Sequence, residues 1–355
     1  HPHRHSAAVG SQNLQRVKHA ETVKASLKNG KRQLATDSLR GITRRQVADT
    51  IAQSLVVKRD IDIALLQAEK RRLIAGVKGL SWTDSDPRGF DALGGCEAVK
   101  GWLRERQTGF SPAARQYGLP VPKGVFFLGP PGTGKSLLAK ATSAAFNVPL
   151  LRFDLKATES KWVGESGDNF RTALKVAVAA APVVLWIDEI EKAVSNHSSD
   201  TASDALGAFL TFMAENTAPV FVIATANDVS RLPPELLRKG RFDELFFVDL
   251  PNFVERVAIL SVAVKAVKRD PATLNLEAVA AKCDGFSGAE LAAVVNDGLF
   301  RAFADGQRAL STEDLLLKTQ TTVPLSRSMA EPLENLRKWA STRTRPANAP
   351  APVAA

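Results

Sequence analysis

A glycine-rich turn between an apolar strand and a helix constrains this chain more than any other feature. Residues 124–128 form an apolar run typical of a strand, and residues 135–146 are expected to form a helix. The turn between them, residues 129–136, reads GPPGTGKS and fits the pattern G-x-x-x-x-G-K-[S/T]. Because glycines let the backbone curl, successive N–H groups and the helix N-terminus can face one anion. The sequence therefore predicts a phosphate-binding loop, and a chance glycine turn is disfavoured because both flanks fit.

Two side chains of this loop are expected to act on a bound nucleotide directly. Lys135 would reach the β- and γ-phosphates, and the Ser136 hydroxyl would ligate Mg²⁺. The loop residues that we expect to bind the nucleotide are Pro131, Gly132, Thr133, Gly134, Lys135, Ser136 and Leu137.

Two carboxylates follow the most apolar strand of the chain. Residues 183–187, VVLWI, show no polar alternation, which is typical of a parallel strand buried on both faces. Asp188 and Glu189 come at its carboxyl end, where ligands bind in open α/β sheets. We expect Asp188 to hold Mg²⁺ through its water shell and Glu189 to orient and polarise the attacking water. Acidic residues also favour helix N-termini, so helix capping is the alternative.

Three polar side chains further along the chain are candidates for the same site. Asn227 follows an expected strand at residues 219–225, where its amide can hydrogen-bond the γ-phosphate or the attacking water. Arg238 and Arg241 are planar, permanently charged donors suited to charge that develops on a phosphate. Taken alone, each would be an ordinary turn or surface residue.

The net charge of +10 is concentrated at one end of the chain. Residues 1–80 hold 16 Lys and Arg against 6 Asp and Glu, so the remainder is neutral by formal count. A basic segment can attract nucleic acid or an anionic surface. A solvated helical face is the interpretation that we favour, with nucleic-acid binding kept as the alternative.

Composition excludes several classes of protein. Hydrophobic residues make up 45% and charged residues 24%, which excludes wholesale disorder. The longest nearly uncharged apolar stretch, residues 176–187, is shorter than the roughly 18 residues of a membrane helix, so we expect no membrane span. With only Cys96 and Cys283, a disulfide-stapled secreted scaffold is not expected, and a cytoplasmic location fits best.

The order of these motifs resembles the AAA family of the AAA+ ATPases over roughly residues 90–317. The resemblance implies ATP and Mg²⁺ as cofactors, Asn227 as the first sensor, and Arg238 and Arg241 as fingers that reach into a neighbour's site. Such sites are completed by the next subunit, so a homo-oligomeric ring, usually a hexamer, is implied. The resemblance also assigns further nucleotide contacts, at Asp91, Gly94, Gly95, Gly288 and Ala289.

A second feature resembles the central-pore loop of that family. Trp162, Val163 and Gly164 would form a loop in which an aromatic and an aliphatic residue grip an extended polypeptide without reading its sequence. Burial of Trp162 under the adjacent helix is the alternative. No H-E-x-x-H occurs, which excludes the membrane zinc-protease branch.

Within the family, the chain most resembles the stand-alone AAA proteins of the hypothetical-chloroplast-reading-frame group of cyanobacteria and plastids. Residues 232–244, 323–326 and 336–340 carry this resemblance. It implies the plastid stroma as the location if the gene is plastid-encoded.

The alternation of strands and helices predicts an α/β fold, a doubly wound parallel-sheet P-loop ATPase domain followed by a small helical domain. A helical, basic segment would precede them. We expect a mobile basic segment at residues 1–35, a helical segment at 36–80, the nucleotide-binding domain at 81–250, the small helical lid at 251–325, and a C-terminal helix with a disordered tail at 326–355.

Three functions are compatible with the sequence. The leading hypothesis is an Mg²⁺–ATP-driven ring that remodels or threads an unknown protein client through its pore. The second is a nucleic-acid-binding ATPase that uses the basic segment. The third is an ATP-gated assembly factor or scaffold, which would have no need for the full set of Glu189, Asn227, Arg238 and Arg241.

Overall fold

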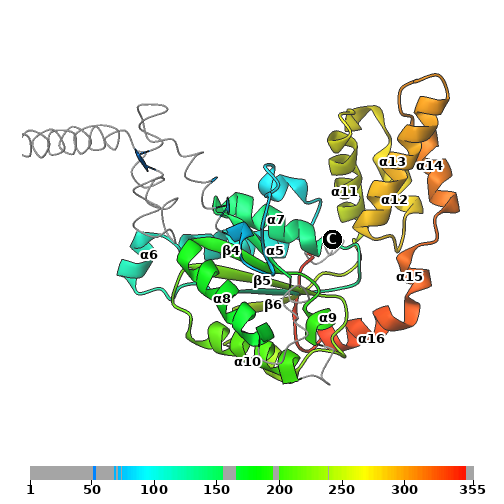
Figure 1. The fold of residues 1–355 in the computed structure, drawn as a ribbon. Coiled ribbons are helices and arrows are strands. Elements are labelled where there is room, and N and C mark those ends of the chain that lie inside the picture. Colours follow the sequence, from blue (N-terminus) through cyan, green and yellow to red (C-terminus); the bar gives the residue numbers. More distant parts are fainter. Residues whose placement is uncertain are drawn as a thin grey trace, which may run out of the picture.

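The computed structural model describes residues 51–52, 68, 71–72, 74–154, 165–194, 200–238 and 240–348. These residues form a sheet domain with a group of helices, the lid, beside it (Figure 1). The predicted segment at residues 1–35, most of the one at 36–80, and the loop with Trp162, Val163 and Gly164 lie outside the described residues.

The sheet has seven strands in the order β1-β3-β4-β5-β2-β6-β7. Neighbouring strands are parallel except at one edge, where β1 runs antiparallel to β3. This order confirms the predicted doubly wound sheet. The strands are β1 (Leu80–Thr83), β2 (Gly124–Leu128), β3 (Leu150–Phe153), β4 (Val183–Ile187), β5 (Val220–Ala226), β6 (Glu244–Phe247) and β7 (Arg345–Pro346).

Helices cover both faces of the sheet because successive residues of a strand point to opposite sides. In β2, Val125 and Phe127 share a core with α5 and α7, whereas Phe126 and Leu128 share a core with α8 and α10. Every residue of β2, β4 and β5 is buried, as expected for parallel strands covered on both faces. The helices of this domain are η1 (Gly89–Ala92), α5 (Glu97–Thr108), α6 (Pro112–Tyr117), α7 (Lys135–Phe146), α8 (Glu165–Ala180), α9 (Ile190–Val194), α10 (Asp200–Glu215) and η3 (Pro234–Leu237).

The lid has its own hydrophobic core, which includes Leu260, Val279, Leu291 and Leu315. Three of its helices begin with a capping box, in which a side-chain oxygen accepts from the N3 amide and the N3 carboxylate accepts from the N-cap amide. These local signals confirm that the C-terminal part is helical. Its elements are α11 (Phe253–Ala266), η4 (Pro271–Thr273), α12 (Leu276–Lys282), α13 (Gly288–Ala304) and α14 (Thr312–Thr321).

After the lid the chain returns to the sheet domain through α15 (Leu325–Ser328) and α16 (Ala330–Ala340), as Figure 1 shows. Leu336 and Ala340 of α16 are buried in the same core as α8 and α10. No helix among the described residues combines the length and apolarity that crossing a bilayer requires.

Two edge strands differ from the sequence-based prediction. β1 was not expected, because four residues without a clear alternation give little local signal, yet it pairs with β3 from Leu80↔Phe153 onward. The tail after α16 was expected to be disordered from its composition. Residues 341–348 instead dock on the sheet, because β7 pairs with β6 and Ala347 is buried there. Both pairings are contacts over long sequence distances, which local composition does not reveal.

Replacing Phe126 with alanine tests the sheet core. Its buried ring meets the ring of Phe242 edge to face, at 5.4 Å between centroids. We expect Phe126→Ala to lower the free energy of unfolding by about 3–5 kcal/mol, because it removes apolar contacts and leaves a cavity. Chemical denaturation followed by tryptophan fluorescence measures the change, with Tyr117→Ala, at a side chain 84% exposed, as the control. An equal loss of unfolding free energy in the two variants would contradict the assignment of Phe126 to the sheet core.

Candidate functional site

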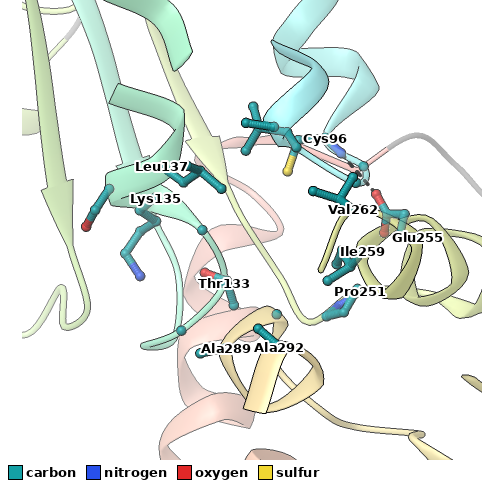
Figure 2. A pocket seen from close by; sticks show the side chains of 18 of the residues that line it. Cys96, Thr133, Lys135, Leu137, Pro251, Glu255, Ile259, Val262, Ala289 and Ala292 are labelled. Carbon is teal, nitrogen blue, oxygen red and sulfur yellow. Dashed lines mark hydrogen bonds between the residues drawn. The ribbon is translucent and has the colours of Figure 1, made fainter. Parts of the chain in front are cut away.

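A cavity of about 510 Å³ lies between the sheet domain and the lid. Figure 2 shows Lys135 and Thr133 on the side of the glycine loop, with Glu255, Ile259 and Val262 of α11 across from them. Most of the predicted nucleotide-binding residues line it: Gly94, Gly95, Pro131, Gly132, Thr133, Gly134, Lys135, Ser136, Leu137, Asp188, Glu189, Asn227, Gly288 and Ala289.

The glycine loop is shaped by its backbone and covered by the lid. Gly134 is the N-cap of α7 and has a φ of 94°, in the left-handed region that glycine adopts without a Cβ penalty. The loop therefore turns directly into the helix, with the helix N-terminus at the cavity. On the lid side, the amide of Ala289 donates to the carbonyl of Gly132 at 3.0 Å, so α13 contacts the loop itself.

Lys135 is a buried cation at this end of the cavity. Its ammonium donates to the carbonyl oxygens of Gly129 at 2.8 Å and Pro130 at 2.7 Å, and the residue is 7% exposed. Burial lowers the pKa of Lys135 to about 8, and Glu191, Asp188 and Glu189 only partly oppose this shift. A desolvated ammonium is stabilised by an anionic ligand, so this end fits a phosphate.

Oxygen atoms suited to a hard cation converge beside Lys135. The Ser136 hydroxyl donates to Asp188 Oδ1 at 3.4 Å, and Thr225 Oγ1 donates to the same oxygen at 2.7 Å. Arg152 Nη2 lies 3.5 Å from the other carboxylate oxygen. Mg²⁺ sites in phosphate-binding proteins use one or two such protein oxygens together with phosphate oxygens and water. The Ser136–Asp188 pair therefore fits the predicted metal.

Glu189 is held at the same edge by two neighbours. Asn227 Nδ2 donates to Glu189 Oε1 at 2.8 Å, and the ammonium of Lys192 contacts Glu189 Oε2. The backbone amide of Asn227 donates to the buried carboxylate of Glu191 at 3.0 Å. Burial raises the pKa of the Glu191 carboxyl. The Glu191 side chain is turned away from solvent and holds the backbone just after β5 in place. The expected water-orienting carboxylate and the expected sensor amide are thus in direct contact.

Some predicted residues are not brought into this cavity. Asp91, in η1, is not among the lining residues, although Gly94 and Gly95 just after it are. Arg238 is exposed at the end of η3, and Arg241 donates to the carbonyl of Leu210. Neither arginine lines the cavity formed by this one chain.

The end of the cavity opposite Lys135 is apolar and was missed by the sequence analysis. Ile259, Val262, Ala263 and Ala266 line it from one face of α11. Their helical spacing is visible in the sequence, but it does not show that this face turns to a cavity. The backbone at Gly94 packs closely against α11. A Cβ at this position would lie 2.4 Å from the amide nitrogen of Ile259, so only glycine fits there.

Other lining or supporting residues were also missed. Thr225 could have been found, because it lies two residues before Asn227 and so on the same side of the strand. Lys192 could have been found from its i,i+3 spacing to Glu189. Nothing in the local sequence points to Arg152, Glu255 or Asn348.

Comparison with known proteins agrees with this geometry. The family model described as "ATPase family associated with various cellular activities (AAA)" matches residues 125–250, and the "AAA+ lid domain" matches residues 273–317. The chain is 37% identical over 309 residues to the uncharacterized AAA domain-containing protein ycf46 of Guillardia theta, covering 85% of this chain and 61% of that protein. It spans 56–63% of the length of the four ycf46 proteins compared.

More distant relatives share the central part of the chain. The proteasome-activating nucleotidase of Aeropyrum pernix is 35% identical over 210 residues, covering 57% of this chain and 51% of that protein. The crystal structure of the FIGL-1 AAA domain has a TM-score of 0.61 at 23% identity, covering 78% of this chain and 96% of that one, a likeness in fold. Both family models fall on the sheet domain and the lid that enclose the cavity, and the chain therefore belongs to the AAA family of ATPases.

Proposed function

We propose that this chain binds Mg²⁺–ATP in the cavity, hydrolyses it, and uses the cycle to remodel or thread protein as a ring of identical subunits. The observation that carries the ATPase proposal is the convergence of three elements at one edge of the sheet. They are the buried ammonium of Lys135, the Ser136–Asp188 oxygen pair, and the Glu189–Asn227 contact.

Binding would begin with electrostatic attraction between the triphosphate and the positive end of the cavity. The triphosphate would lie along the glycine loop, where the N-terminus of α7 and the Lys135 ammonium face it. Lys135 then exchanges backbone carbonyl partners for phosphate oxygens, which restores its ordinary preference for the charged form. Mg²⁺ would neutralise charge that develops on the phosphates, and Ser136 with Asp188 would hold it.

Hydrolysis would use the Glu189–Asn227 pair. The water oxygen attacks the γ-phosphorus while the bond to the β–γ bridging oxygen breaks, and the water proton passes to Glu189 or to the phosphate. Glu189 Oε1 accepts from Asn227 Nδ2, so the amide fixes the carboxylate that orients this water. Thr225 stabilises the neighbouring Asp188, because its hydroxyl donates to that carboxylate.

The arginines are proposed to act on a neighbouring subunit. Arg238 is exposed and Arg241 bonds a carbonyl of its own chain, and neither lines this chain's cavity. A guanidinium delivered from the next subunit would stabilise charge on the transferred phosphoryl group. Ring assembly, common in the AAA+ family, would provide that neighbour.

The protein-remodelling part of the proposal draws on the relatives of the central domain and on the sequence. Among the relatives of the central domain are proteins named ATP-dependent zinc metalloprotease FtsH and proteasome-activating nucleotidase. Trp162, Val163 and Gly164 are proposed as the client-gripping loop from the sequence alone. The +10 charge of residues 1–80 supports nucleic-acid binding as the second candidate.

Substitution of Glu189 tests the hydrolytic site. We expect Glu189→Gln to bind ATP with near-normal affinity but to release phosphate about 10²–10⁴-fold more slowly, because the glutamine cannot orient the water as a base. Calorimetric titration measures the ATP affinity, and a phosphate-release assay measures the hydrolysis rate. Glu277→Gln, at an exposed position of the lid, is the matched control. Turnover at the wild-type rate would assign the role of Glu189 to another group.

Mixing two inactive variants tests whether the sites are shared. Arg238→Ala and Arg241→Ala, made separately, are each expected to lower turnover about 10³-fold or more if the guanidinium acts on the phosphoryl group. We expect Lys135→Ala to lose ATP binding, while its Arg238 and Arg241 remain able to act on a neighbouring subunit. Mixed with an arginine variant, it should restore part of the phosphate release. If no mixture of the two proteins, at any ratio, releases phosphate faster than the separate variants, the arginines do not act between subunits.

A stimulation assay tests what the ATPase acts on. We expect unfolded protein to raise phosphate release, and Trp162→Ala to lose this response while keeping the basal rate, because the tryptophan would contact the client and not ATP. Tyr117→Ala, another exposed aromatic, is the control. Stimulation by DNA or RNA alone, falling steeply with added salt, would instead favour the nucleic-acid function.

A further inference from the structure

The hydroxyl of Thr225 joins the two acidic residues that follow β4. Its oxygen, Oγ1, donates its single proton to Asp188 Oδ1 at 2.7 Å and accepts a hydrogen bond from the backbone amide of Glu189 at 3.0 Å. Thr225 itself is fully buried, at 0% exposure. One side chain on β5 therefore contacts both the expected metal ligand and the residue expected to orient the attacking water.

The register of the sheet brings Thr225 to this position. Ala224 pairs with Ile187, the last residue of β4, so Thr225 lies level with the point at which the chain leaves that strand. β5 reads VFVIATA, and Thr225 is its one polar side chain. Valine is also β-branched and equally suited to a buried strand, so packing alone gives no reason for a hydroxyl here.

Glu189 has a backbone conformation that needs support. Its φ of 49° lies in the left-handed region, which is uncommon for residues other than glycine. Such a conformation is unfavourable by itself and persists where the surrounding structure holds it. Here the Glu189 amide donates to Thr225 Oγ1, and the Glu189 carbonyl accepts from the Lys192 amide at 2.9 Å. The first of these contacts depends on a side chain, so a substitution can remove it.

The left-handed turn sets the direction of the Glu189 side chain. From this position Glu189 Oε1 accepts from Asn227 Nδ2 at 2.8 Å. Thr225 and Asn227 lie two residues apart, so the same short segment holds the Glu189 backbone and the Glu189 carboxylate. Without the Thr225 contact, φ would relax toward its ordinary range and the carboxylate would turn away from the Asn227 amide.

We propose that Thr225 is a positioning residue for ATP hydrolysis, whose hydroxyl holds Glu189 in its left-handed conformation and so directs the carboxylate at the attacking water. The proposal rests on the proposed function, because it assumes that Glu189 orients that water. Thr225 gives its one proton to Asp188 and has none left to donate to a nucleotide. Its effect on the reaction is therefore exerted through its two neighbours, mainly through Glu189.

The contacts expected to bind the triphosphate depend on other groups. Lys135 is held by the carbonyls of Gly129 and Pro130, at the glycine loop. Loss of the Thr225 hydroxyl should therefore slow hydrolysis and leave ATP binding nearly unchanged, which is the kinetic pattern of an interaction that matters only during the reaction.

Thr225→Val removes the hydroxyl from a side chain of nearly the same shape. At saturating Mg²⁺–ATP we expect phosphate release about 10- to 100-fold slower than in the wild type, the effect of losing hydrogen bonds to a charged group and to a buried amide. Thr225→Ser, which keeps the hydroxyl, should stay within about threefold of the wild type.

Thr142→Val is the matched control and should keep the wild-type rate. Thr142 is also fully buried in the sheet domain, but its hydroxyl donates to the carbonyl of Leu138 in its own helix, at 2.7 Å. The same change of side chain is thus made away from the two acidic residues.

A Glu189→Gln background separates positioning from binding and folding. In that background, calorimetric titration measures the ATP affinity with and without Thr225→Val, and we expect the two Kd values to agree within about threefold. The residual phosphate release should slow much less than in the wild-type background when Thr225→Val is added. The carboxylate that Thr225 positions is absent there, so the two substitutions are not additive.

Each outcome separates positioning from a simpler role. An unchanged rate in Thr225→Val, or an equal loss in Thr225→Ser, would overturn the role of the hydroxyl. A matching loss of ATP affinity, or the full 10- to 100-fold slowing in the Glu189→Gln background, would show that Thr225 does not act through Glu189 and would overturn the proposal as well.

Two further measurements keep the test decisive. Thr225→Ala repeats the comparison if the valine variant does not fold, as judged by its thermal unfolding. A wild-type chain that releases no phosphate from Mg²⁺–ATP would overturn the proposed function itself, whereas equal release by the wild type and Thr225→Val would overturn only the role of Thr225.

Discussion

The register of three buried parallel strands determines where the glycine loop, Asp188, Glu189 and Asn227 lie. Leu128 at the end of β2 pairs with Ala226 of β5, and Ile187 at the end of β4 pairs with Ala224. The chain segments that leave these strands therefore start side by side, and they carry the glycine loop, Asp188 and Asn227. All residues of the three strands are buried, and successive side chains pack into the two cores on opposite faces of the sheet. A one-residue shift in register would move each side chain into the other core and disrupt the packing of both, which disfavours other registers.

The cavity itself belongs to neither domain alone. The sheet domain supplies the cation, the carboxylates and the glycine loop, whereas α11 of the lid supplies the apolar wall. The two domains have separate hydrophobic cores, so their relative position depends on a few contacts across the seam. Among these are Ala289 with Gly132 and Glu255 with the Cys96 amide.

The C-terminal elements, α16 and residues 341–348, add a third connection to this seam. Arg337 contacts Asp249 and Asn348 contacts Glu255, and both acidic residues line the cavity. The return of α15 and α16 from the lid to the sheet domain thus brings the end of the described chain to the cavity. These contacts give residues 341–348 a structural reason to dock, where composition had indicated a disordered tail after the C-terminal helix.

The sequence by itself determined the elements whose signal is local. The glycine loop, the apolar strand before Asp188 and the capped helices of the lid are encoded within a few residues, since turn chemistry and periodicity are short-range. The family resemblance also followed from motif order, and the family models agree with it. Only the tertiary structure decided that β7 pairs at the sheet edge, that α11 turns its apolar stripe to the cavity, and that Glu255 joins Cys96 to Asn348. Those contacts join residues up to 159 positions apart, and their stability comes from burial and hydrogen bonding that exist only once the chain has folded.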